Sequence, residues 1–292
     1  MNAAHIKLYK YFCAAIFCLI LLGGSVRAMN AGLSCPDWPL CFGRFIPNYQ
    51  PQVYFEFIHR VLAGLISIAA VYLNFRIIFE RSIHKSIKWV AGGALILLIA
   101  QIIMGGLTVL LKLKYGIVTG HLALGTAFFS LSFWAYLSLK ENEAAASAPA
   151  RTVAPTIVLV AAIYGQILLG GLVASNYAGL VCPNFPLCEG KFIPTLHGLI
   201  GLQVIHRLGA YTLATIIIFY SIYVLTRVES LLMRRLAKVL VALVVLQICV
   251  GVANVKFLTP PLITVLHLGV AVSLLAIGVR LLHFSASGCR EG

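Results

Sequence analysis

Charged side chains are scarce in this chain of 292 residues: Asp, Glu, Lys and Arg together make up 10% of it, and only 8 residues are acidic. A soluble domain of this length would need far more charge on its surface. The apolar fraction of 61% and the mean hydropathy of +0.99 describe a protein whose solvent is mostly lipid. The composition therefore excludes a soluble domain and predicts an integral membrane protein.

Apolar stretches long enough to cross a bilayer, which takes roughly 20 residues, occur eight times. They cover residues 11–29, 54–79, 87–111, 118–139, 155–175, 201–225, 236–256 and 262–284. The first stretch follows Lys7 and Lys10 and could be taken for a cleavable signal peptide. It has an internal counterpart, however, because residues 19–39 align without a gap to residues 166–186. We therefore expect an all-α fold of eight transmembrane helices that includes the first stretch.

A sixteen-residue segment occurs twice, at residues 32–47 (GLSCPDWPLCFGRFIP) and at residues 179–194 (GLVCPNFPLCEGKFIP). Eleven of the sixteen positions are identical at an offset of 147, and each copy is followed twelve residues later by His-Arg. The polar, alanine-rich connection at residues 140–155 lies between the copies and is typical of a linker. We expect two pseudo-symmetric four-helix bundles in tandem, residues 1–145 and 146–292, with the same topology and an axis along the membrane normal.

The chain also lacks a concentrated basic patch. Its net charge of +14 is spread over several loops, which argues against nucleic acid as a partner. If both termini are cytoplasmic, fourteen Lys and Arg residues fall on the cytoplasmic side and six on the other. Loops rich in Lys and Arg stay in the cytoplasm, so we expect a multi-pass protein of the inner (plasma) membrane, with cytoplasmic termini and outer cysteine loops. Anionic lipid headgroups are then its natural contacts.

Four of the eight histidines lie inside predicted spans and away from their cytoplasmic ends. His59 and His206 follow the repeated segments, while His121 and His267 follow short outer loops. At about 1.5 Å per residue, all four lie one to two turns below the outer surface. No third Cys, His or carboxylate accompanies either pair, which argues against zinc. A single buried histidine could equally be a hydrogen-bonded core residue, but two equivalent pairs in apolar four-helix interiors favour haem ligation.

Close to His59 and His206, the two halves differ in formal charge at one position. Arg60 and Arg207 match, and either snorkel to the outer headgroups or neutralise haem propionates. Glu56 aligns with Gln203 at the offset of 147, so only the first half has a carboxylate one helical turn before its histidine. An ionisable group at membrane depth is costly unless it is paired or used. We expect Glu56 to be catalytic, as a proton acceptor or electrostatic stabiliser; the alternative is a structural ion pair with Arg60 or Arg27.

Each repeated segment contains two cysteines with five residues between them: Cys35 with Cys41, and Cys182 with Cys188. On the outer side, where thiols oxidise, each pair is expected to close a small disulfide ring. The ring would stiffen a loop that covers a site, and a redox role of the first pair is the alternative. A second echo places Gln and Gly together in QIIMGG (101–106), QILLGG (166–171) and QICVG (247–251). We interpret these glycines as points of close helix packing.

Taken together, the CPDWPLC and CPNFPLC loops, the EFIHR motif at residues 56–60, the second His-Arg pair, His121 and His267 resemble the haem A synthase family over all eight predicted helices. The resemblance implies conversion of haem O to haem A, in which the C8 methyl becomes a formyl group by successive hydroxylations. It also implies haem b as the redox cofactor, held in the C-terminal half. Haem O would then be bound by His59 and His121, and haem b by His206 and His267.

Two other functions use the same residues. A non-enzymatic dihaem b-type electron carrier would need the same four histidines, and a membrane thiol/quinone oxidoreductase would use the outer cysteines. The sequence leaves open the electron acceptor, for which a quinone is one candidate, the source of the oxygen atom and the haem route. Haem O synthase, cytochrome oxidase assembly factors and a second copy of the chain are candidate partners. His197 is expected in an outer loop near the second haem.

Overall fold

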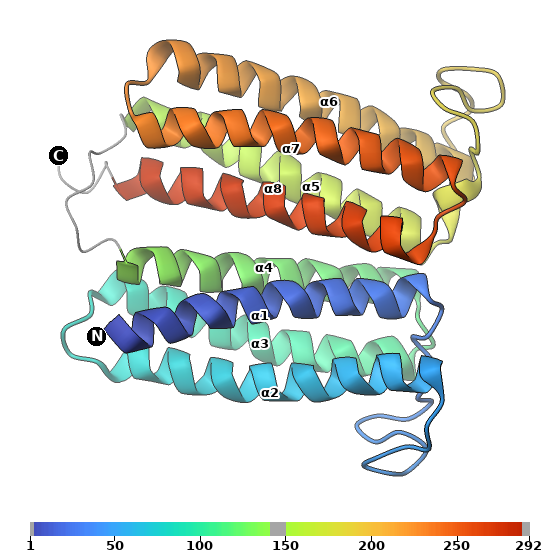
Figure 1. The fold of residues 1–292 in the computed structure, drawn as a ribbon, viewed down its shortest axis with the longest axis horizontal. Helices are drawn as coiled ribbons and strands as arrows, with labels where there is room; N and C mark the ends of the chain where they lie inside the picture. The colour runs from blue at the N-terminus through green and yellow to red at the C-terminus, as the bar shows by residue number, and fades with distance from the viewer. Residues whose placement is uncertain (1–2, 141–149, 288–292) are drawn as a thin grey trace. The chain divides into compact units, whose positions relative to one another are not determined.

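The computed structural model describes residues 3–140 and 150–287, which contain helices but no strand. Eight of these helices are long and apolar enough to cross a membrane, so the predicted all-α fold with eight spanning helices is confirmed. The helices are α1 (Ala3–Ala28), α2 (Pro51–Phe79), α3 (Lys85–Leu110), α4 (Tyr115–Lys140), α5 (Val153–Ser175), α6 (Gly198–Arg227), α7 (Leu231–Lys256) and α8 (Pro261–Ser287) (Figure 1). Two short 3-10 turns, η1 (Ala150–Thr152) and η2 (Ala178–Leu180), flank α5.

The helices begin before the apolar stretches that predict them. Thus α1 begins at Ala3 rather than at residue 11, and α2 begins at Pro51 rather than at residue 54. Proline is favoured in the first helical turn, where its missing N–H would have no partner in any case, and α8 also begins with a proline. Hydropathy marks only the part of a helix inside hydrocarbon, whereas backbone hydrogen bonding continues into the headgroup region.

The chain divides into two compact units, Met1–Asn142 and Glu143–Gly292. In the first unit, α1 and α3 each contact both α2 and α4, so the four helices form a ring with α2 and α4 diagonally opposite. In the second unit, α5 and α7 each contact both α6 and α8, which makes α6 and α8 the diagonal pair. The predicted boundary at residue 145 and most of the predicted linker lie outside the described residues. The pseudo-symmetric relation between the halves stays a prediction.

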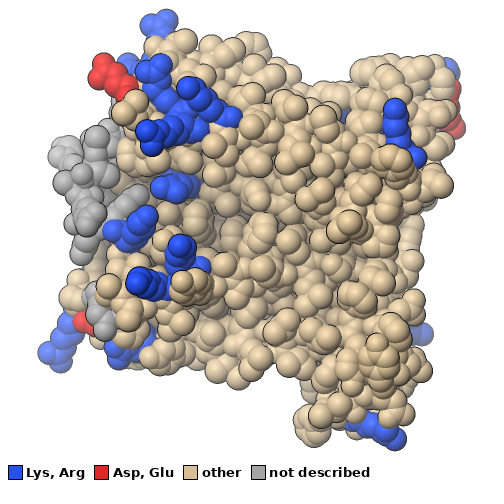
Figure 2. All heavy atoms as spheres, viewed as in Figure 1, with Lys and Arg blue, Asp and Glu red and all other residues tan. Residues whose placement is uncertain are grey.

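Most of the helical surface is apolar and faces outward. In the most apolar segment of each spanning helix, only 22% to 39% of the residues are buried. Apolar side chains such as Ile68, Ile96 and Leu262 are 70%, 69% and 81% exposed. Figure 2 shows Lys and Arg towards the helix ends on the face drawn, with uncharged surface between them. Helices with so much exposed apolar surface are stable in hydrocarbon, where their backbone hydrogen bonds are all internal. The chain is therefore a multi-pass membrane protein.

Candidate functional site

The repeated cysteine segments form a loop between α1 and α2 and a second loop between α5 and α6. Cys35 is disulfide-bonded to Cys41, and Cys182 to Cys188, with a sequence separation of 6 in each bond. All four cysteines are at most 2% exposed. Sulfur atoms this deeply buried exchange poorly with outside thiols, so the arrangement favours a stiffening role for both bonds.

Asp37 and Trp38 shape the first loop. The Asp37 carboxylate accepts hydrogen bonds from the backbone N–H groups of Gly43, at 2.7 Å, and Phe42, at 2.6 Å. These two bonds hold the pKa of Asp37 below its ordinary value. Trp38 lies against α3, because a Cβ added at Gly106 would come within 3.2 Å of the indole ring. The loop therefore extends over the α3 side of the bundle end.

Arg60 fastens this loop to α2. Its Nη1 donates to the carbonyl oxygens of Asp37 at 2.7 Å and Leu40 at 2.8 Å, and its Nη2 donates to the carbonyl of Cys35 at 3.0 Å. In the second unit, Arg207 donates to three loop carbonyls in the same way, those of Asn184, Leu187 and Cys182. The two roles expected from the sequence, snorkelling to the headgroups and neutralisation of haem propionates, do not involve hydrogen bonds to loop carbonyls. Both arginines clamp a cysteine loop, a role that the sequence pattern did not predict.

Glu56 is 4% exposed and both of its oxygens are engaged. Oε1 forms an ion pair with Arg60 Nη2 at 2.5 Å, and Oε2 accepts from the backbone N–H of Cys35 at 2.8 Å. The ion pair with Arg60, which the sequence offered as an alternative, is thus present. In the second unit, Gln203 donates to the carbonyl of Gly179 at 3.3 Å, and its Oε1 is buried without a hydrogen-bond partner among the described residues. The two halves therefore differ in charge at this position.

His59 and His121 lie on the diagonal helices of the first unit. Nδ1 of each ring is buried without a hydrogen-bond partner among the described residues. Nε2 of His121 lies 3.4 Å from the amide nitrogen of Gln101 on α3. An imidazole nitrogen buried in an apolar bundle without a partner is costly, so the pair is suited to a ligand between the helices.

His206 and His267 occupy the corresponding positions on α6 and α8, the diagonal helices of the second unit. Nδ1 of His267 is buried without a hydrogen-bond partner among the described residues, and its Nε2 lies 3.4 Å from the amide nitrogen of Gln247. His206 is held differently. The amide nitrogen of Gln166 on α5 lies 3.1 Å from its Nδ1 and donates to its backbone carbonyl at 2.8 Å. The position of Gln166 in the first half is occupied by Leu19.

Each of the four rings packs on a glycine of a neighbouring helix. A Cβ added at Gly23 or Gly105 would lie 3.0 Å from Cε1 of His59 or His121, respectively. In the second unit, the corresponding distances are 3.2 Å at Gly170 and 2.9 Å at Gly251. The interpretation of the Gln-Gly echo as helix packing was incomplete, because these glycines make room for the imidazole rings. The echo contains three of these four glycines, Gly105, Gly170 and Gly251, and its recurrence was the signal that could have revealed their role.

His197 lies apart from this arrangement. It is exposed in the loop that precedes α6, with an extended backbone and no side-chain hydrogen bond to the helix start. Its carbonyl accepts from the N–H of Gly201 at 3.1 Å, so its contribution there is made by the backbone. Its expected position in a loop agrees with this placement, while the outer side of that loop and its expected proximity to a haem stay predictions.

The two histidine pairs fit a planar cofactor with two axial nitrogen ligands better than a small metal ion. Among residues 3–140 and 150–287, no group of three or more His, Cys, Asp or Glu side chains is gathered as a metal centre. What the units offer is two imidazoles from diagonal helices, unpartnered nitrogens and glycine surfaces on the intervening helices. These features suit haem, which takes axial histidines within an apolar four-helix interior.

The chain is similar over most of its length to proteins of one family. The sequence model of the family described as Cytochrome oxidase assembly protein (COX15-CtaA) matches residues 7–279. The Heme A synthase of Shewanella oneidensis is 28% identical over 311 aligned residues, covering 91% of this chain and 92% of that protein. The Heme A synthase of Symbiobacterium thermophilum is 31% identical, with 68% of each chain covered. That of Rhizobium leguminosarum bv. trifolii is 29% identical and covers 84% of this chain and 80% of its own.

Proposed function

The chain belongs to the haem A synthase family, and we propose on this premise that it oxidises the C8 methyl of haem O to a formyl group, which yields haem A for terminal oxidases. The observation that carries the proposal is the presence of two histidine pairs, each on diagonal helices of one unit and each packed on glycine. One pair alone would suffice for a simple cytochrome. Two pairs provide for a substrate and a cofactor of the same chemical class.

We further propose that haem O is bound by His59 and His121, and that haem b is bound by His206 and His267. The hydrogen bonds from Gln166 support the second assignment, because the amide nitrogen of Gln166 holds both the ring and the backbone carbonyl of His206 in place. His59 has no corresponding amide, since Leu19 stands at that position. A weakly oriented ligand suits a substrate that must leave after reaction. Haem b, when bound, would accept electrons from the substrate and pass them on.

Glu56 is the catalytic residue in this proposal. It lies one turn before His59 on α2, and it brings a negative charge to the half that we assign to the substrate. Loss of electrons from the C8 methyl builds positive charge, which a fixed carboxylate in a low-dielectric site stabilises. Because both oxygens of Glu56 already accept hydrogen bonds, electrostatic stabilisation fits the geometry more directly than proton acceptance.

The remaining assignments concern the surroundings of the site. Arg60 and Arg207 hold the loops through their Nη atoms, and we propose that their positive charge also faces the haem propionates. The excess of Lys and Arg predicted on one side supports an inner (plasma) membrane protein with cytoplasmic termini and outer cysteine loops. A quinone is the proposed electron acceptor. Haem O synthase, cytochrome oxidase assembly factors and a second copy of the chain are proposed partners.

The proposal is tested by extracting the pigments of cells that make haem O, with and without this chain, and separating the haems by chromatography. We expect haem A only where the chain is present. A dihaem electron carrier would instead retain two spectrally similar haems and produce no haem A. A thiol oxidoreductase would lose its activity in Cys182→Ser and keep it in His121→Ala. Absence of haem A when a competent electron acceptor is supplied would refute the synthase function.

A further inference from the structure

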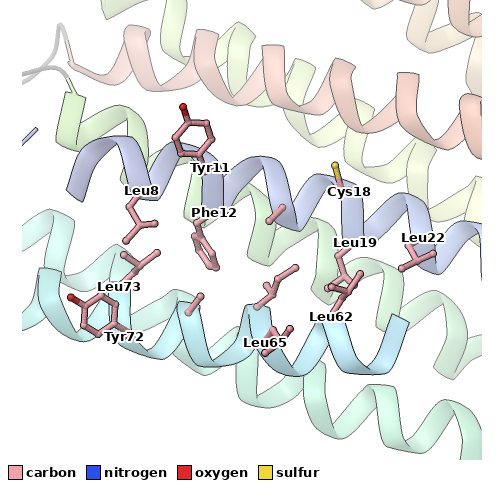
Figure 3. A pocket seen from close by; sticks show the side chains of 13 residues that line it. Leu8, Tyr11, Phe12, Cys18, Leu19, Leu22, Leu62, Leu65, Tyr72 and Leu73 are labelled. Atoms are coloured by element: carbon pink, nitrogen blue, oxygen red, sulfur yellow. The ribbon is translucent and has the colours of Figure 1, made fainter. Parts of the chain in front are cut away.

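An apolar groove of about 590 Å³ runs along the seam between α1 and α2 in the first unit. Its lining comes from these two helices alone and consists of aliphatic and aromatic side chains together with Cys18. Figure 3 shows Leu19 of α1 and Leu62 of α2 pointing toward one another near one end, while Leu8 and Leu73 lie near the other. From Leu8 to Leu22 the groove follows about 21 Å of α1, at about 1.5 Å per residue.

One end of the groove adjoins the His59 site. Leu22 precedes Gly23, on which the His59 ring packs at 3.0 Å from a built Cβ. Leu62 follows His59 by three residues and therefore lies on the same side of α2. The inner end of the groove and the His59 ring are thus presented by neighbouring residues of the same two helices.

The corresponding place in the second unit is polar and filled. At the offset of 147, Leu19 and Leu62 become Gln166 and Gly209. Gln166 lies directly over Gly209, because a Cβ added there would collide with the amide oxygen of Gln166. The amide nitrogen of Gln166 is committed to His206. The first unit therefore has an apolar groove at this place, whereas in the second unit the hydrogen-bonded side chain of Gln166 fills the equivalent space.

We propose that the α1–α2 groove, lined by Leu19, Leu22 and Leu62 at its inner end, holds the isoprenoid side chain of haem O. Haem O differs from haem b in carrying a long farnesyl-derived chain, so the two haems demand different surroundings. The inference rests on the proposed assignment of haem O to the first unit. In a membrane, the side chain of haem O is shielded from water in the lipid as well as in the groove. Close packing against the groove residues is therefore what favours binding there. The groove therefore orients the substrate and selects haem O over haem b.

Cys18 provides a direct probe, because it lines the groove, and Cys249 on α7 provides an exposed control thiol. The purified full-length protein in detergent is treated with N-ethylmaleimide alone, with haem O or with haem b, and modification of each thiol is followed by mass spectrometry. With about 90% of the site occupied by haem O, we expect modification of Cys18 to slow roughly tenfold, since only the empty fraction reacts. Cys249 should react at one rate throughout.

Three outcomes would overturn the inference. In the first, Cys18 is modified at an unchanged rate although the absorption spectrum shows haem O bound. In the second, haem b protects Cys18 as well as haem O does. In the third, Cys18 is fully protected without any haem. The last would mean that a lipid or detergent chain is the occupant. Haem A formation by the same preparation separates the two proposals: if haem A forms while Cys18 stays unprotected, only the groove assignment fails, and if no haem A forms, the proposed function fails.

A variant tests selectivity independently. Ala15 lines the groove, and Ala162 occupies the equivalent position on α5. We expect Ala15→Phe to reduce the preference of the first site for haem O over haem b, measured by competitive titration, and Ala162→Phe to leave it unchanged. An unchanged preference in a folded Ala15→Phe protein contradicts the proposal. Should that variant not fold, protection of Cys18 in the unaltered protein still decides the question.

Discussion

At the residue scale, the informative difference between the halves is Glu56 against Gln203. Both side chains are 4% exposed, but only the carboxylate joins an arginine to the loop backbone. A buried carboxylate is stable when it is paired in this way. Pairing and catalysis are compatible, because a carboxylate with fixed partners is a preorganised negative charge.

We predict that Glu56→Gln separates these two roles. Glutamine keeps an acceptor oxygen for the N–H of Cys35, and the second unit shows that glutamine is accommodated beside a folded loop. The first loop and the haem b content should therefore be retained. Haem A formation should fall by about a hundredfold or more, a loss typical of removing one preorganised electrostatic group. The haems are quantified by chromatography, and thermal unfolding reports on the fold.

A normal yield of haem A in Glu56→Gln would show that Glu56 serves only to hold Arg60 and the cysteine loop in place. Arg60→Lys provides the complementary measurement. It keeps the charge but cannot reproduce the three bonds to loop carbonyls, so it should lower the stability of the protein. If Arg60→Lys leaves thermal unfolding unchanged, the clamp contributes little to stability.

At the scale of the helices, the site depends on glycines that face histidines. Diagonal helices present the imidazoles, and the two intervening helices supply a flat surface on which the rings pack. Glycine is needed there because of space rather than backbone conformation. Hydropathy predicted the eight helices, yet it says nothing about rotation of each helix around its axis, and so it could not assign these contacts.

We predict that Gly251→Ala disturbs the second haem site. The new Cβ would lie 2.9 Å from the His267 ring, and overpacking of this kind costs about 1–3 kcal/mol. Gly165→Ala on α5 is the control, because nothing lies within 4 Å of its built Cβ. Haem b retained after purification, measured by its absorption spectrum, should fall in the first variant and not in the second. Equal retention in both would show that the ring has room to move.

At the scale of the whole molecule, each histidine pair belongs to one unit, and each unit has its own cysteine loop and arginine clamp. This division underlies our assignment of different haems to the two pairs. It also means that damage to one pair leaves the packing around the other in place, since additivity holds for sites without shared partners.

We predict different haem contents for variants of the two pairs. His206→Ala should lose haem b and stop haem A formation, while haem O still binds to the first unit. His121→Ala should keep haem b and lose haem O and its oxidation. Both are read from the haems extracted per mole of purified protein. Loss of the same haem in both variants would contradict the assignment of one haem to each unit.

The sequence by itself determined the membrane class, the eight spans, the duplication, the four histidines and the Glu56/Gln203 difference, because composition, hydropathy and repeats are properties of the chain read in order. Only the tertiary structure decided that Arg60 and Arg207 clamp the loops, that glycines seat the imidazoles, and that Gln166 contacts His206. These contacts join residues distant in the chain, and they depend on how each helix is rotated within its bundle. Such rotation follows from packing between helices, which a sequence pattern along one helix does not specify.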